Sequence, residues 1–330
     1  MHRRLLDALA CPACRGDLDL VGAKLDGDHV MSGTLVCSGC AETYRIVDRI
    51  PRFVPSENYA RSFGFQWNLF KLEQFDSASG TTLSRDRFFS ETGWAPSWLE
   101  GKLVLDAGCG AGRFLDVATR TGARVIGVDL SDAVDAAAST LADRGNLDLV
   151  QARIDALPFR DGVFDGIYCI GVLQHTSDPE ACARALGRAL RPGGRIAITA
   201  YERRRWTMLY SKYWVRRAVR RLSPDRLYRL ISGLMPVLFP LTEVLFRLPL
   251  LGRVFRFLIP IANYVDLHLS LRQRYRWALL DTFDMLAPAY DKPQRYEDVR
   301  HWLEAEAITE IDRLPNPGLS IVGRKAVHGS

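Results

Sequence analysis

The sequence lacks the long, uninterrupted apolar run that a transmembrane helix or a secretory signal requires. The first residues, MHRRLLDALACPACR, contain no apolar segment of signal-peptide length. The most apolar region, residues 230–260, is interrupted by Pro236, Pro240 and Pro249, so no clean run reaches the ~20 residues that span a bilayer. We therefore expect a cytoplasmic protein, with any membrane contact peripheral and at the inner face of the membrane.

A second absence concerns the glycine-rich loop VLDAGCGAGR at residues 104–113. Gly108 and Gly110 fit the first two glycines of the dinucleotide fingerprint G-x-G-x-x-G, but the third position is Arg113. In addition, Asp106 precedes the first glycine by two residues, and its carboxylate would repel a pyrophosphate at the helix N-terminus. The loop therefore favours a cationic ligand without phosphate, and S-adenosylmethionine (SAM) is such a ligand.

Alternating apolar strands and amphipathic helices follow this loop. The segments predicted as strands with their loops are residues 124–131, 147–159, 164–179 and 190–201. Residues 131–143 and 178–189 carry apolar positions at helical spacing. The alternation predicts an α/β fold with a parallel sheet and a ligand site at the carboxyl ends of the strands. Asp129 ends the second strand, where such folds place an acid that accepts ribose hydroxyls.

At this point the sequence resembles the class I SAM-dependent methyltransferases, over residues 100–200 and again over 296–324. The motifs D-x-G-x-G-x-G, V-D-L-S, L-P-F, V-L-Q-H-T and L-R-P-G-G occur in this order at family-like spacing. The resemblance implies a Rossmann-like, seven-stranded sheet. Close relatives usually have an adenine-binding aspartate where this chain has Arg153, and we expect Asp155 to substitute for it. The implied SAM site comprises Asp106, Gly108, Gly110, Gly112, Asp129, Leu130 and Asp155.

Four of the seven cysteines form two C-x2-C pairs separated by twenty-two residues. This spacing predicts a structural zinc ion held by Cys11, Cys14, Cys37 and Cys40, whose binding supplies much of the folding free energy of the segment. The alternative is four unrelated buried cysteines. Cys109, Cys169 and Cys182 lie in apolar segments and are interpreted as packing residues.

The cysteine-containing segment also looks like the zinc-ribbon domain that serves as a small activator subunit of tRNA and protein methyltransferases, here fused to its enzyme. Residues 1–55 contain seven Arg and Lys and seven Asp and Glu, so this segment has no net charge. Phosphate neutralisation requires a basic surface, and we therefore interpret the ribbon as structural and nucleic-acid binding as disfavoured.

The positive charge is concentrated in residues 201–260, which carry thirteen Arg and Lys against three Asp and Glu in a chain of net charge +6. A basic, apolar and proline-containing segment is typical of one that lies at a membrane interface. Two alternatives remain open: a helical insertion that covers the active site or forms a homodimer surface, and an RNA-binding segment. Membrane contact, if present, is assigned to residues 202–260.

These patterns predict a division of the chain into consecutive parts. The parts are a zinc ribbon (1–55), a helical cap beside the acceptor site (56–99), the SAM-binding core (100–201), a basic helical insertion after the fifth strand (202–292), and a C-terminal helix and hairpin (293–330). Segments such as SFGFQW resemble a bacterial subgroup of fused ribbon methyltransferases. The resemblance implies methylation of a small-molecule, glycan- or lipid-linked acceptor in a biosynthetic pathway. The alternatives are an RNA methyltransferase and a noncatalytic, SAM-binding or partner-activating module.

A hydroxyl or amine acceptor requires a base, whereas a carbon or thiolate acceptor does not. His175 is the only histidine in the loop VLQHTSD, which follows the fourth strand and is expected beside the sulfonium. Its alternative role is a structural hydrogen bond to the backbone. Asp281 and Asp284 lie three residues apart, on one face of a helix, and are candidates to orient His175 or to act as the base; Tyr290 is a further candidate.

Overall fold

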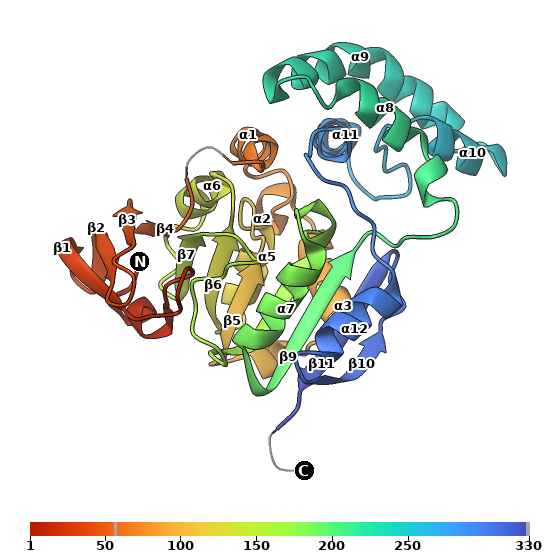
Figure 1. Cartoon of the computed structure of the whole chain (residues 1–330). Helices are drawn as coiled ribbons and strands as arrows, with labels where there is room; N and C mark the ends of the chain where they lie inside the picture. The colour runs from red at the N-terminus through yellow and green to blue at the C-terminus, as the bar shows by residue number, and fades with distance from the viewer. Residues whose placement is uncertain (56–57, 328–330) are drawn as a thin grey trace.

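The computed structural model describes residues 1–55 and 58–327. Its centre is a continuous mixed sheet with the strand order β1-β2-β3-β4-β7-β6-β5-β8-β9-β11-β10 (Figure 1). The core strands are β5 (Leu103–Ala107), β6 (Arg124–Asp129), β7 (Leu147–Gln151), β8 (Phe164–Ile170), β9 (Leu190–Ala200), β10 (Ile308–Arg313) and β11 (Leu319–Lys325). Strands β5 to β9 are parallel, and β11 is antiparallel to both β9 and β10. The predicted Rossmann-like sheet and C-terminal hairpin are confirmed.

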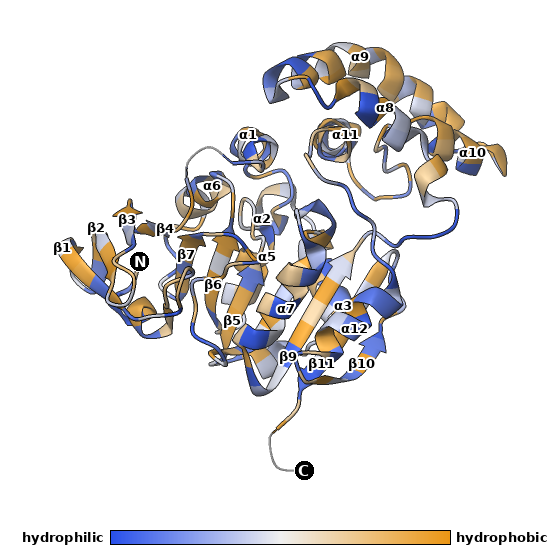
Figure 2. Cartoon of the chain, viewed as in Figure 1, coloured by the Kyte–Doolittle hydropathy of each residue, from blue (hydrophilic) through white to orange (hydrophobic). Residues whose placement is uncertain are grey.

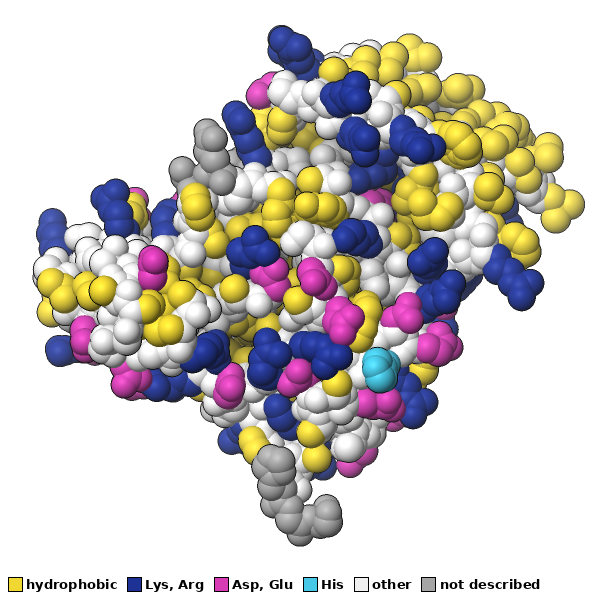
Figure 3. Space-filling view, viewed as in Figure 1, with side chains coloured by type: hydrophobic (Ala, Val, Ile, Leu, Met, Phe, Trp, Pro, Cys, Tyr) yellow, Lys and Arg dark blue, Asp and Glu magenta, His cyan; other side chains and the backbone are white. Residues whose placement is uncertain are grey.

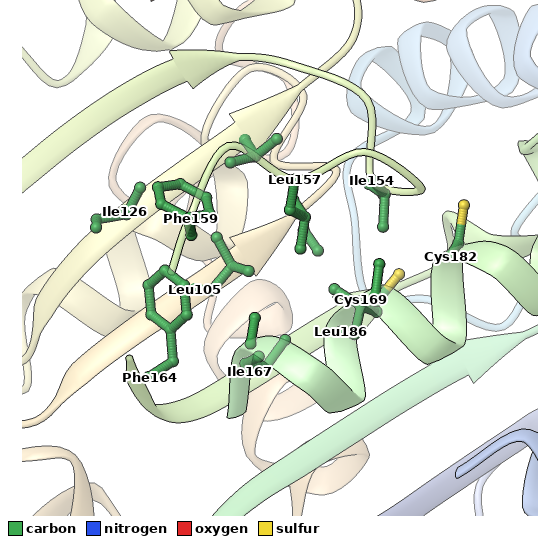
Figure 4. Packing of buried hydrophobic residues seen from close by; sticks show 14 of the residues in the cluster. Leu105, Ile126, Ile154, Leu157, Phe159, Phe164, Ile167, Cys169, Cys182 and Leu186 are labelled. Carbon is green, nitrogen blue, oxygen red and sulfur yellow. The ribbon is translucent and has the colours of Figure 1, made fainter. Parts of the chain in front are cut away.

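Helices cover both faces of this sheet. The helices of the N-terminal cap and core are α1 (Arg61–Leu69), α2 (Asp76–Ser79), α3 (Leu83–Thr92), α4 (Pro96–Leu99), α5 (Arg113–Thr119), α6 (Ala133–Thr140), α7 (Pro179–Ala189) and α12 (Tyr296–Glu304). One apolar cluster joins the sheet to α3, α5 and α6, and the other joins it to α7 and α12. Figure 4 shows the second cluster, in which Cys169 and Cys182 pack among Leu105, Ile167 and Leu186.

The N-terminal ribbon extends the sheet instead of standing apart from it. It consists of the short 3-10 helix η1 (Arg3–Ala8) and the strands β1 (Leu18–Asp26), β2 (His29–Cys37), β3 (Thr43–Val47) and β4 (Ile50–Arg52). Strand β4 pairs with β7 in parallel through Arg52 and Gln151, and the guanidinium of Arg52 also binds Asp135 at 2.6 Å. Leu9, Leu35 and other ribbon residues belong to the same apolar cluster as residues of the central sheet, α7 and α12. The ribbon and the core therefore share one hydrophobic interior.

The insertion follows β9 as a group of helices over the carboxyl ends of the strands (Figure 1). It contains η3 (Thr207–Leu209), α8 (Ser211–Val219), α9 (Pro224–Leu245), α10 (Leu251–Leu258) and α11 (Leu271–Leu286). Leu227, Ile231, Met235 and Phe239 of α9 pack with Leu279 and Phe283 of α11. An ion pair between Glu243 and Arg274, with an N–O distance of 2.6 Å, also joins these helices.

The expectation that prolines interrupt the apolar segment is wrong for α9. The helix is continuous over 22 residues and contains Pro236 and Pro240, while Pro249 lies between α9 and α10. Both internal prolines are exposed, so water can bind the carbonyls that lose their intrahelical donors. By length and composition alone α9 is long and apolar enough to cross a membrane. Figure 2 shows how much of α9 and α10 is apolar.

Candidate functional site

A cavity of about 710 Å³ lies at the carboxyl ends of the core strands, between the glycine loop and α11. Its volume falls in the range of ~300–1,000 Å³ that is common for small-ligand sites. Residues from α1, α3, the glycine loop, the end of β6, the loop after β8 and α11 line it. The predicted site residues that the structure brings together here are Gly108, Gly110, Asp129, Leu130, His175, Asp281 and Asp284, and Tyr290 packs behind His175.

The glycine loop approaches its neighbours too closely for larger residues. Gly108 has a φ of +91°, and a Cβ atom there would lie 2.4 Å from a side-chain carbon of Val172. Gly110 has a φ of +53°, and its Cβ would lie 3.0 Å from the indole nitrogen of Trp67. These two positions therefore require glycine for both conformation and space, and they leave the loop backbone exposed to the cavity.

Asp129 connects the end of β6 to the loop. Its carboxylate accepts hydrogen bonds from the amide of Gly110 at 2.9 Å, and from the amide and hydroxyl of Ser131 at 2.9 and 2.7 Å. Burial raises the pKa of this carboxyl group above its ordinary value. The carboxylate is held in place by these donors at the wall of the cavity, which is the position expected for a group that binds ribose hydroxyls.

Other residues of the predicted SAM site are outside the cavity lining. Asp106 is 2% exposed at the end of β5, and its Oδ2 atom has no hydrogen-bond partner within residues 1–55 and 58–327. Burial raises the pKa of Asp106 well above its ordinary value. Gly112 caps α5 below the loop. Asp155 is instead paired with Arg153, whose Nε lies 2.8 Å from Oδ1, and Ile154 faces the cavity in its place.

His175 lies in the short 3-10 helix η2 (Leu173–His175) and is 6% exposed. Its Nδ1 atom is 3.0 Å from the carbonyl oxygen of Tyr290. Because a carbonyl oxygen only accepts, Nδ1 carries the proton, and in the neutral ring Nε2 is an acceptor. Phe63 and Tyr201 contact the ring edge-on at centroid distances of 5.3 and 5.6 Å. The ring therefore has a fixed tautomer and orientation in the cavity wall.

The two predicted aspartates both face the cavity from α11. The hydroxyl of Tyr264 donates to Asp281, and the amide of Gln74 lies 3.4 Å from the same carboxylate. Burial raises the pKa of Asp281 to about 6. Burial also raises the pKa of Asp284, and the nearby charge of His175 opposes this increase.

Two arginines that line the cavity were not predicted from the sequence. Arg113 directly follows the glycine loop and donates to Ser84 at 2.9 Å and to Gln74 at 3.0 Å. Burial and the nearby Arg87 lower its pKa to about 10. Arg87 on α3 binds Glu91 at 2.8 Å. The third position of the glycine fingerprint marked Arg113 as unusual, whereas the polar sequence of α3 offered no signal for Arg87.

The metal prediction is supported by geometry. The Sγ atoms of Cys11, Cys14, Cys37 and Cys40 all lie within 4.8 Å of one another. The Cys11–Cys40 and Cys14–Cys37 sulfur distances are 3.7 and 3.4 Å, close to the ~3.8 Å expected around a tetrahedral zinc with ~2.3 Å bonds. The hydroxyl of Tyr44 lies 3.3 Å from the Cys11 sulfur, where it can donate to a thiolate. The cluster fits a structural zinc ion.

Two protein families match parts of the chain. Residues 105–198 match the family described as a methyltransferase domain. Residues 2–48 match the family described as Trm112p-like protein. The chain thus combines a methyltransferase domain with a Trm112p-like zinc-ribbon domain, as the motifs indicated.

Individual relatives match the core of the chain. A ubiquinone biosynthesis O-methyltransferase from Alkalilimnicola ehrlichii is 30% identical over 34% of this chain and 47% of its own length. One from Methylocella silvestris is 35% identical over 37% of this chain and 46% of its own length. The chain therefore spans less than half the length of these relatives. A solved complex of the Haloferax volcanii Trm112 methyltransferase activator with a putative methyltransferase is 14% identical, covers 81% of this chain and 99% of that chain, and has a TM-score of 0.44.

Proposed function

We propose that this chain, with its methyltransferase domain at residues 105–198, is a SAM-dependent methyltransferase that modifies a small-molecule or lipid-linked acceptor. The main support is that the glycine loop, Asp129, His175 and the two α11 aspartates all line one cavity. Two curated relatives named as O-methyltransferases of ubiquinone biosynthesis support a small-molecule acceptor with a reacting oxygen.

The chain's residues fit the cofactor in charge and in shape. When bound, SAM supplies an electrophilic methyl group on a cationic sulfur. The loop at Gly108 and Gly110 permits close approach of the backbone, and Asp129 would accept hydrogen bonds from the ribose. Asp106 lies buried beneath the loop, where its raised pKa favours the neutral carboxyl group. The carboxylate of Asp129 at the cavity wall favours a cationic ligand over a pyrophosphate.

His175 is proposed as the base for an acceptor hydroxyl. Nε2 takes the hydroxyl proton while the acceptor oxygen forms its bond to the methyl carbon, and the carbon–sulfur electron pair remains on sulfur. Tyr290 holds Nδ1 through its carbonyl oxygen, so the accepting nitrogen is already selected. Asp284 lines the same cavity as His175, and we assign its carboxylate to stabilise the imidazolium that forms. Most of the remaining catalysis is alignment of the two reactants.

The Trm112p-like match favours one second candidate, an RNA methyltransferase. Two observations weigh against this candidate. Residues 1–55 carry no net charge, and the ribbon shares the hydrophobic interior of the core. A ribbon bound in this way stabilises its own enzyme, and we propose that its zinc ion is structural.

The proposal is tested by incubating the purified protein with methyl-labelled SAM and, separately, with RNA, lipid and soluble-metabolite fractions of its host. We expect label in the lipid or metabolite fraction, and less label from an Asp129→Ala variant at the same low concentration of SAM. Label in RNA alone would support the second candidate. Binding of SAM without transfer to any fraction would instead support a noncatalytic module.

A further inference from the structure

The insertion helix α9 has two apolar stripes at helical spacing. One stripe, described above, is buried against α11. The other consists of Leu230, Leu234, Val237, Leu241 and Val244, which are 45–69% exposed. A helix that only covers an active site needs one apolar stripe, so the second stripe has no role in the fold of the described residues.

The exposed stripe continues onto neighbouring segments. Leu251, Val254 and Leu258 of α10 are at least half exposed, and Leu250 before them is 89% exposed with a φ of +62°. We call this continuous surface of α9, α10 and Leu250 the apolar face. Figure 3 shows it in yellow over the upper right of the molecule. Exposed apolar surfaces of this extent mark interaction sites.

Exposed arginines lie on α8, on the turn between α8 and α9, and on α9 and α10 themselves. Arg217, Arg220, Arg221, Arg226, Arg229 and Arg253 form no ion pair with a carboxylate in the described parts of the chain. Figure 3 shows dark blue side chains beside the apolar face. The surrounding residues 201–260 carry a net charge of +10, because thirteen cations face three anions.

We propose that the apolar face docks the protein onto an anionic lipid surface, with α9 lying parallel to it. The leucines and valines enter the boundary of the acyl chains, and the unpaired arginines bind lipid phosphates. The apolar stripe matches the acyl chains of such a surface, and the uncompensated positive charge matches its anionic headgroups.

Charge and packing favour a lipid surface over a second copy of the chain, an RNA or a membrane-spanning orientation of α9. A second copy of the chain docked through the same face would place its arginines against like charges. An RNA would leave the apolar stripe in water. A membrane-spanning orientation would separate α9 from α11 and break the Glu243–Arg274 pair, and it would also expose Asn263, which donates to Thr242 at 3.1 Å. The docked orientation keeps all of these contacts.

Docking would also place the active site near the membrane. Ala262, Tyr264 and Leu267, which follow α10, line the cavity together with α11. A lipid-borne acceptor could thus reach the cavity along the insertion, a consequence that rests on the proposed function. The docking itself is independent of SAM and of methyl transfer.

The test is flotation of the purified full chain with vesicles of phosphatidylcholine alone or mixed equally with phosphatidylglycerol. We expect binding only to the anionic vesicles, and a loss of binding as salt is raised. Arg226→Gln with Arg229→Gln should weaken binding by about fivefold per arginine. Val237→Asp with Leu241→Asp should weaken it at least about tenfold. Val21→Asp, an exposed residue of β1, is the matched control and should bind as the wild type does.

Binding of SAM, measured by calorimetry on each variant, separates docking from the proposed function and confirms that the variants fold. Absence of flotation at low salt, or equal flotation with both vesicle types, would overturn the proposal. A dimer that Val237→Asp dissolves, without vesicle binding, would assign the apolar face to a second copy. Protein that remains in host membranes after alkaline extraction would assign α9 to a membrane-spanning orientation.

Discussion

Replacing His175 tests whether the cavity contains a base. The side chain is 6% exposed, with Nδ1 directed at the Tyr290 carbonyl oxygen. His175→Ala removes the nitrogen that would accept the hydroxyl proton, while the glycine loop and Asp129 remain unchanged. General base catalysis commonly contributes 10²–10⁴-fold. We therefore expect turnover to fall at least ~100-fold, a barrier increase of ~2.7 kcal/mol, with SAM affinity within about twofold of wild type.

A second substitution separates base chemistry from a structural hydrogen bond. His175→Asn keeps an N–H donor near the Tyr290 carbonyl but has no basic nitrogen. It should be as inactive as His175→Ala. His301→Ala removes an exposed histidine of α12 and should behave as wild type.

The assay is steady-state methyl transfer to the fraction that accepts label, at saturating acceptor. A loss of tenfold or less for His175→Ala would refute the assignment and move the role to Asp281 or Asp284, or to an acceptor that needs no base. Recovery of activity by His175→Asn would show that the contact with Tyr290 is structural.

Three further predictions concern metal, pH and the glycine loop. Metal analysis of purified protein should find one zinc per chain. Cys37→Ser should lower both the zinc content and the melting temperature, whereas the control Cys182→Ser should still contain one zinc. Because the pKa of Asp281 is raised from 3.8 to about 6, the folded state binds more protons between these values, so this residue lowers stability as pH rises from 4 to 6. Urea unfolding at pH 4 and pH 6 measures this loss in the free energy of unfolding, which is at most about 3 kcal/mol, and Asp281→Asn should remove it. If wild type and Asp281→Asn lose the same free energy between the two pH values, the raised pKa is not that of Asp281. Gly108→Ala should weaken SAM binding at least about tenfold in calorimetry, because its Cβ would lie 2.4 Å from a neighbouring side chain, whereas Gly233→Ala on exposed α9 should have no effect.

Local motifs were sufficient to predict the core and the ribbon. The glycine loop, the acid that ends β6 and the paired cysteines each act through neighbours close in sequence, so their spacing determines their geometry. The expectation that Asp281 and Asp284 share one helical face agrees with α11, because a separation of three residues puts side chains on the same side of a helix, and both line the cavity.

Features that depend on tertiary contacts were not predicted. The pairing of β4 with β7 joins segments about one hundred residues apart, and no motif encodes it. Packing against α11 and exposure of both prolines allow α9 to continue where local rules place a break. Asp155 pairs with Arg153, an interaction that its position in the loop did not reveal. In the first two cases a partner distant in sequence, or the solvent, determined the outcome, and in the third a neighbour two residues away did.

Calorimetric titration of the purified chain with SAM tests the central claim most directly. We expect a single SAM site of micromolar affinity, no binding of NAD, and a loss of roughly 1–3 kcal/mol of SAM binding free energy for Asp129→Ala, since the ribose hydroxyls lose a charged acceptor. Asp225→Ala, an exposed acid of α9, should bind as the wild type does. Binding of NAD without binding of SAM, or equal SAM affinity for Asp129→Ala and wild type, would contradict it.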